Sequence, residues 1–141
     1  MSAEHTREIM TAYLKEMAER GPYGRHLAAD VTWTTIGTDQ VVTGREAVEQ
    51  FIRSFHEQAF DANPRFRVTL IGDGQAALEA DFIGTHTGEF LGVAPTGRAV
   101  NVPYAVFYDL RDGAITALRG HISMELLRRQ ITAPQMAGAR A

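Results

Sequence analysis

The second half of the chain contains four long segments in which apolar and polar residues alternate, and this pattern constrains the fold more than any other feature. The segments span residues 66–71, 76–86, 99–110 and 114–123. Alternation with a period of two is typical of strands, and the Asp-Gly dipeptides at 73–74 and 112–113 are typical of hairpin turns. The pattern predicts an antiparallel meander whose strands, at about ten residues, suit a bent sheet around a cavity. Gly84 and Gly88 either form the bulges that such curvature needs or mark a loop.

The first half of the chain carries helical patterns. Ser2 can cap a helix whose apolar residues recur at the spacing of one helical stripe. These residues are Ile9, Met10, Tyr13, Leu14 and Met17. Thr43 and Glu46 have the spacing of a capping box that opens a second helix. Residues 31–36 predict a strand between the two helices, and residues 124–131 predict a last short helix. Helices followed by an antiparallel sheet indicate an α+β domain with its helices on one face of the sheet.

Composition limits the class of protein. The chain has 141 residues, 45% of them hydrophobic and 22% charged, which suits one globular domain. We expect this domain to span residues 1–132 and residues 133–141 to form a flexible tail. A net charge of -3 without a cluster of Lys or Arg argues against a nucleic-acid partner.

Three kinds of feature are missing from the sequence. There is no cysteine, so disulfides and thiolate chemistry are excluded. The N-terminus lacks a signal-like pattern and no apolar stretch approaches the length of a membrane span, so we expect a soluble cytoplasmic protein without a membrane partner. The chain also lacks metal-binding histidine spacings, a nucleophilic serine elbow and glycine loops for nucleotides. Acid/base chemistry without a metal or redox cofactor, or simple binding, remains.

The last two predicted strands carry polar side chains that can share a face. If residues 114–123 alternate regularly, Arg119, His121 and Ser123 lie on one face. Tyr104 and Tyr108 share a face of the preceding strand. An imidazole beside two phenols would make a pocket that is apolar and able to move protons. The alternative is that His121 is a half-exposed strand residue and that the tyrosines only pack.

Asp81 is the acidic residue of segment 76–86 that we expect to be buried. It could neutralise the guanidinium of Arg119, in a pair that is either structural or catalytic. Trp33 belongs either to the core or to the wall of a pocket. We assign no role to four histidines: His5, His26, His56 and His86.

Four short runs carry a family resemblance: Gly84-Thr-His-Thr-Gly-Glu-Phe-Leu-Gly92, Pro95-Thr-Gly-Arg98, Asp112-Gly-Ala-Ile115 and Gly44-Arg-Glu-Ala-Val48. From about Leu27 to Ile131 the chain resembles the SnoaL-like polyketide cyclases, whose cone-shaped α+β fold is shared with ketosteroid isomerase, scytalone dehydratase and limonene epoxide hydrolase. The resemblance implies a curved antiparallel or mixed sheet with helices on its concave face, enclosing a pocket. It also implies a homodimer that pairs through the outer face of the sheet.

The acidic residues of these relatives are replaced in this chain. Ser123 stands where the cyclases carry an aspartate on the final strand, and Thr35 falls near the position of the isomerase aspartate on the first strand. Gly120 occupies the position of an epoxide hydrolase aspartate beside Arg119. The resemblance therefore indicates the fold more firmly than the reaction.

These observations lead to one functional hypothesis. We expect a cofactor-independent enzyme that cyclises or isomerises a hydrophobic polyketide-like substrate by acid/base chemistry, with His121, Asp81 and Arg119 as catalytic residues. The alternatives are epoxide opening, as in limonene epoxide hydrolase, and a small-ligand-binding domain without chemistry. The predicted substrate-binding residues are Tyr13, Trp33, Thr35, Tyr104, Tyr108 and Ser123.

Overall fold

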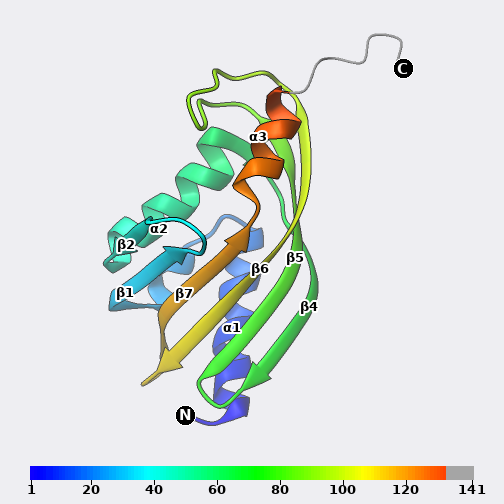
Figure 1. The fold of residues 1–141 in the computed structure, drawn as a ribbon. Coiled ribbons are helices and arrows are strands. Elements are labelled where there is room, and N and C mark those ends of the chain that lie inside the picture. Colours follow the sequence, from blue (N-terminus) through cyan, green and yellow to red (C-terminus); the bar gives the residue numbers. More distant parts are fainter. Residues whose placement is uncertain (133–141) are drawn as a thin grey trace.

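The computed structural model describes residues 1–132, and the predicted tail at residues 133–141 lies outside them. A seven-stranded mixed sheet curls into a half-barrel, with α-helices inside the curve and at one end of it (Figure 1). This arrangement confirms the predicted α+β cone.

The sheet combines long and short strands. They are β1 (Leu27–Thr35), β2 (Val41–Thr43), β3 (Phe60–Ala62), β4 (Arg65–Gly72), β5 (Gln75–His86), β6 (Ala99–Arg111) and β7 (Ala114–Ile122). Their order in space is β2-β1-β7-β6-β5-β3, and β4 also pairs with β5. All pairs are antiparallel except β1 with β7. The predicted meander thus corresponds to β4 through β7, whereas β2 and β3 are too short for the pattern to have indicated them.

Three α-helices accompany the sheet: α1 (Ala3–Ala18), α2 (Arg45–Arg53) and α3 (Met124–Thr132). A 3-10 turn, η1 (Tyr23–His26), precedes β1, and a π-helix, η2 (Ser54–Ala59), continues α2. Ser2 caps α1 as predicted, because its Oγ accepts from the main-chain nitrogen of His5 at 3.0 Å. Within residues 1–132, no helix combines the length and the apolar character that crossing a membrane would require.

The capping box predicted for α2 does not form. Thr43 pairs with Thr32 as the last residue of β2 and is therefore unavailable as the N-cap. Gly44 takes that position with a φ of 103°, and its main-chain nitrogen donates to the oxygen of Val31 at 2.8 Å. Glycine suits this position because other residues are strained at such a φ.

Gly84 lies within β5 without forming a bulge, whereas Gly88 lies in the loop that follows β5, as the alternative predicted. Both glycines also serve close packing. β5 pairs with β6 through Gly84 without a shift in register. A Cβ on Gly84 would lie 2.7 Å from the main-chain oxygen of Asp61, and one on Gly88 would overlap the main-chain oxygen of Gln58. Both glycines therefore allow the end of β5 to approach β3 and η2.

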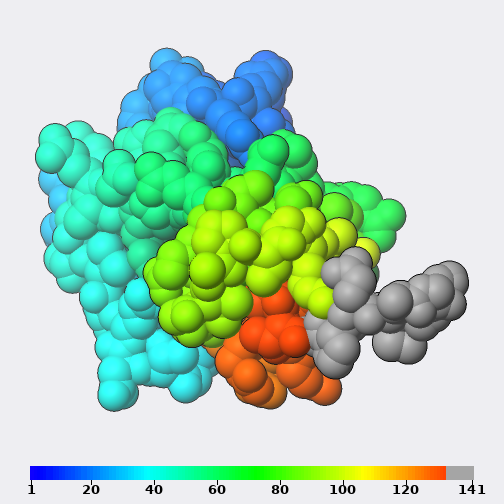
Figure 2. Space-filling view, turned by 90° about the horizontal axis from the view of Figure 1, so that it is seen from above, coloured from blue at the N-terminus to red at the C-terminus, as the bar shows by residue number. Residues whose placement is uncertain are grey.

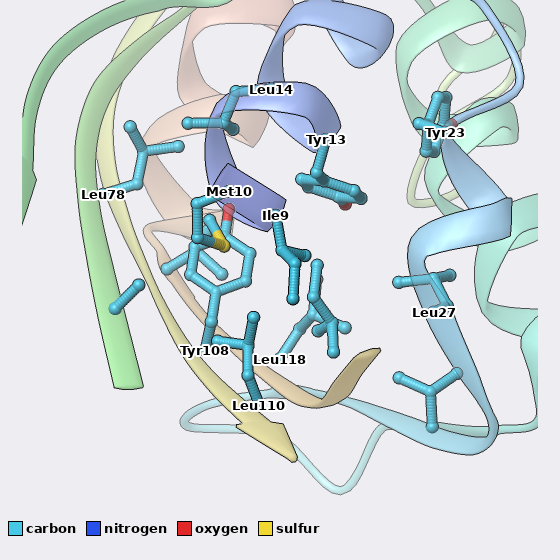
Figure 3. Packing of buried hydrophobic residues seen from close by; sticks show 14 of the residues in the cluster. Ile9, Met10, Tyr13, Leu14, Tyr23, Leu27, Leu78, Tyr108, Leu110 and Leu118 are labelled. Atoms are coloured by element: carbon cyan, nitrogen blue, oxygen red, sulfur yellow. The ribbon is translucent and has the colours of Figure 1, made fainter. Parts of the chain in front are cut away.

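The core is divided into two clusters. Figure 3 shows the larger one, in which Ile9, Met10, Tyr13 and Leu14 of α1 pack against sheet residues such as Leu118. The second surrounds three residues, Phe60, Phe82 and Leu127, near α3. Tyr104 packs against both clusters. The sheet is therefore filled at its two ends, and the space between them is available for a site.

Candidate active site

A cavity of about 330 Å³ lies between the two core clusters. Six aromatic side chains line it: Trp33, Phe51, Phe55, Phe82, Phe90 and Tyr104. The rings of Phe55 and Phe82 stack with centroids 4.5 Å apart. No Asp, Glu, Lys or Arg among residues 1–132 lines the cavity. Such a lining favours a neutral, hydrophobic ligand.

Segments from three parts of the chain meet at this end of the molecule. In Figure 2, the turn before β2 is cyan, the segment after β5 is yellow-green and α3 is orange to red. They contribute Gln40, Leu91 and Met124 to the cavity. His86 holds the base of the middle segment, because its main-chain nitrogen donates to the oxygen of Arg98 at 2.9 Å and its Nδ1 accepts from the nitrogen of Thr96 at 3.2 Å.

Two imidazoles line the cavity, and His56 is the less exposed of them. It lies in η2, the π-helical turn that continues α2, and such turns are often found at functional sites. The Nδ1 atom lies 2.9 Å from the main-chain oxygen of Ile52. Because a carbonyl oxygen only accepts, Nδ1 carries the hydrogen and donates it. In the neutral ring, Nε2 therefore keeps a lone pair, and it has no hydrogen-bond partner among the described residues.

The surroundings of His56 keep its ring neutral. Burial lowers its pKa from the usual value of 6.5, against smaller opposing effects of the Ile52 oxygen and Glu57. Its ring packs edge-on against Phe82, with centroids 5.3 Å apart. At neutral pH the imidazole is thus uncharged and able to accept a proton.

Tyr104 brings a phenol to the same cavity. Burial, and the negative charge of Asp81, raise the pKa of Tyr104 far above its usual value, so the phenol keeps its proton. Its ring also contacts Phe82, at 6.4 Å between centroids. His56 and Tyr104 therefore place a proton acceptor and a proton donor around one aromatic ring.

A smaller lobe of about 40 Å³ adjoins the cavity and shares His56 and Tyr104 with it. Tyr13 and Tyr108 line this lobe, with ring centroids 6.1 Å apart. The hydroxyl of Tyr13 is buried without a hydrogen-bond partner among the described residues. Burial raises the pKa of both phenols, so both remain hydrogen-bond donors.

A chain of hydrogen bonds joins three other residues of the wall. The indole Nε1 of Trp33 donates to Oγ1 of Thr35 at 2.8 Å, and this hydroxyl donates to Oε1 of Gln40 at 2.9 Å. Thr35 is 1% exposed, whereas Gln40 is exposed at the mouth. The chain joins the cavity-lining residues Trp33 and Thr35 to the exposed Gln40.

The structure does not bring the three predicted catalytic residues together. The Asp81 carboxylate binds Arg65 at 2.7 Å and does not pair with Arg119, which instead binds Asp109 at 2.8 Å. His121 borders the cavity, but its side chain is exposed and its ring packs edge-on against Phe107. The inward face of β7 carries Leu118, Gly120 and Ile122, so Arg119 and His121 belong to the outer face.

The predicted substrate-binding residues divide into three groups. Trp33, Thr35 and Tyr104 line the cavity, whereas Tyr13 and Tyr108 line only the smaller lobe. Ser123 lines neither one. It is exposed, and its Oγ accepts from the main-chain nitrogen of Leu126 at 3.0 Å, so it caps α3.

Three polar residues of the cavity were missed in the sequence: His56, and Thr38 and Gln40 in the turn between β1 and β2. His56 extends the row of Val48 and Ile52 at steps of four residues, and this helical spacing was the signal that could have revealed it. Thr38 and Gln40 give no comparable signal, because they lie in this turn.

The family model for SnoaL-like polyketide cyclases matches residues 8–131. No curated protein matches the chain. A proposed SnoaL-like polyketide cyclase from Jannaschia sp. CCS1 has a similar structure, with a TM-score of 0.83, 21% identity and coverage of 94% of each chain. A proposed ketosteroid isomerase from Kribbella flavida gives a TM-score of 0.67 at 19% identity, covering 85% of this chain and 78% of that one. The match over nearly all of residues 1–132 shows that this chain belongs to the SnoaL-like polyketide cyclase family.

Proposed function

We propose that the cavity binds a neutral, hydrophobic polyketide-like molecule and that the protein cyclises or isomerises it by acid/base chemistry, with His56 as the general base. The observation that carries this proposal is the neutral imidazole in an aromatic wall, with Nδ1 occupied by Ile52 and Nε2 available. A general base needs a lone pair that points to substrate and a proton affinity matched to neutral pH.

The proposed reaction begins with removal of a proton from a carbon beside a carbonyl group. Nε2 of His56 takes this proton, and the electron pair of the broken C–H bond forms an enolate. The phenol of Tyr104 donates a hydrogen bond to the enolate oxygen, which stabilises the charge where it develops. In an isomerisation, the imidazolium returns the proton to another carbon. In an aldol cyclisation, the enolate carbon attacks a second carbonyl and the new alkoxide receives the proton.

Ligand binding without chemistry is the second candidate. No carboxylate lines the cavity within residues 1–132, and this favours binding without chemistry. The resemblance implies aspartates as the bases, and this chain has Thr35, Gly120 and Ser123 in their place. The predicted roles of Asp81, Arg119 and His121, and the epoxide-opening alternative, stay predictions.

Exchange of hydrogen for deuterium separates these possibilities. β-Tetralone, a neutral bicyclic ketone, is incubated with the protein in deuterium oxide, and loss of its α-proton signals is followed by NMR. Wild type should accelerate exchange, and His56→Asn should reduce the acceleration by roughly 100-fold or more. His121→Asn is the matched control, because it removes the exposed imidazole. Loss of exchange in the His121 variant alone would contradict the assignment of His56 and favour the sequence-based one. Binding of the ketone without exchange would favour the binding function.

A further inference from the structure

The hydrogen bonds between Trp33, Thr35 and Gln40 have only one possible direction. An indole N–H can only donate, so Thr35 Oγ1 accepts from Trp33. The hydroxyl of Thr35 has one hydrogen, and among residues 1–132 its acceptor is the side chain of Gln40. A buried hydroxyl needs that acceptor, so Gln40 presents its oxygen rather than its nitrogen to Thr35.

Because the amide oxygen of Gln40 binds Thr35, both hydrogens of the amide nitrogen stay available to donate. The side-chain nitrogen has no acceptor among the described residues, and Gln40 lines the mouth of the cavity. The relay from Trp33 therefore presents a hydrogen-bond donor at the entrance of a pocket whose wall is otherwise mostly apolar.

The backbone around Gln40 is held in place as well. The main-chain nitrogen of Thr35 donates to the oxygen of Gln40 at 3.1 Å. Thr38 Oγ1 donates to the oxygen of Thr35 at 2.8 Å and accepts from the nitrogen of Gln40 at 3.0 Å. A donor that is fixed on both its backbone and its side chain loses little entropy when a ligand binds.

The residues that line the cavity determine which kind of acceptor atom can bind to the Gln40 amide. No Lys or Arg among the described residues lines the cavity, so the wall has no permanently cationic side chain to neutralise a carboxylate or a phosphate. A neutral amide N–H matches an uncharged acceptor such as a carbonyl, hydroxyl or ether oxygen.

We propose that Gln40 is a specificity-determining residue, which donates a hydrogen bond to an uncharged oxygen on the outer end of the ligand. Thr35 and Trp33 are its positioning residues, because they hold the amide oxygen and turn the nitrogen toward the ligand. This inference rests on the proposed function in one respect, namely that the cavity takes a neutral hydrophobic molecule.

Trp33 provides the measurement. It is the only tryptophan of the chain and lines the cavity, so quenching of its fluorescence reports binding. The probes are fluorenone and fluorene, which differ by one carbonyl oxygen. Wild type should bind the ketone about two- to tenfold more tightly, as expected for one net hydrogen bond. Gln40→Met, of similar shape but without the amide, should bind the two probes equally. Gln50→Met is the matched control on the exposed side of α2 and should keep the preference.

Variants of Thr35 test the positioning. Thr35→Val removes the hydroxyl at constant shape and should reduce the preference for the ketone, while Thr35→Ser keeps the hydroxyl and should restore it. If Gln40→Met binds fluorenone more tightly than fluorene by the same factor as wild type does, the role of Gln40 is overturned. A preference lost in Tyr104→Phe but kept in Gln40→Met would overturn it too, and would place the ligand oxygen at the phenol. If neither probe quenches Trp33 of the wild type, the proposed binding function fails, and the inference fails with it.

Discussion

Nδ1 of His56 lies 2.9 Å from the main-chain oxygen of Ile52, four residues earlier in the chain. The bond occupies one nitrogen and leaves the other as the only basic atom of the ring. Burial lowers the pKa of this group from 6.5. His56 is therefore in its basic form at neutral pH and becomes protonated only in more acidic solution.

The rate of proton exchange should follow this titration. Exchange of β-tetralone should be independent of pH near neutrality and fall in acid, with a midpoint below 6.5 because the pKa is lowered. The rate is measured by NMR across buffers of constant ionic strength. A midpoint above 6.5 would contradict His56 as the base.

Stability should depend on the same group. Since the pKa of His56 is lower in the folded chain, the unfolded chain binds more protons below about pH 6.5, and acid favours unfolding. The free energy of unfolding of wild type should thus decrease as pH falls from about 6.5 to 5. His56→Asn should have a flatter profile in this window, as measured by urea denaturation. Equal slopes for the two proteins would show that His56 is not responsible.

Position 120, where the resemblance to epoxide hydrolase implies an aspartate, has no room for a side chain. A Cβ on Gly120 would lie 2.5 Å from the indole carbon Cζ2 of Trp33, so the ring occupies the space that a side chain would need. Gly120→Ala should displace the indole and lower the free energy of unfolding by about 1–3 kcal/mol. A change in the emission of Trp33 should accompany this loss, and an unchanged spectrum at unchanged stability would contradict the close packing.

Gly84 should be sensitive to substitution for a different reason. A Cβ there would meet main-chain atoms of β3, which cannot rotate away. Gly84→Ala should cost about 1–3 kcal/mol in urea denaturation. Gly72→Ala is the control, because Gly72 also lies in a strand and its nearest neighbour would be 3.6 Å away. Equal effects at the two positions would contradict this reason.

The predicted homodimer can be tested on the outer face of the sheet. Leu70 and Phe107 are 64% and 44% exposed there, beside the ion pair of Arg119 with Asp109. A second copy of this face would supply both apolar area and opposite charges. We expect Leu70→Asp to convert a dimer into a monomer in light scattering. Leu91→Asp, at the cavity mouth and 52% exposed, should leave the dimer intact. A dimer that survives the change at Leu70 would place the interface elsewhere.

The sheet could be predicted because its signals are local. Strands β4 and β6 end at the Asp-Gly turns that connect them to β5 and β7, so neighbouring residues determine these two hairpins. The site combines residues from distant parts of the chain, and alternation alone does not say which face of a strand points inward. Arg119 and His121 do share a face, as predicted, but that face is the outer one because Leu118 and Gly120 fill the inner one. His56 continues the four-residue spacing of Val48 and Ile52, but the π-helical turn that carries it is not predicted by any simple periodicity.

The parallel pairing of β1 with β7 has a consequence for synthesis of the protein. Before β7 emerges from the ribosome, β1 can pair only with the three residues of β2. Contacts between such distant parts of a chain form slowly, because a long loop must close first. The first strand, including Trp33, therefore waits until β7 has been made. Until then, the N-terminal part of the nascent chain carries an open sheet edge, where premature pairing with another chain is the main hazard.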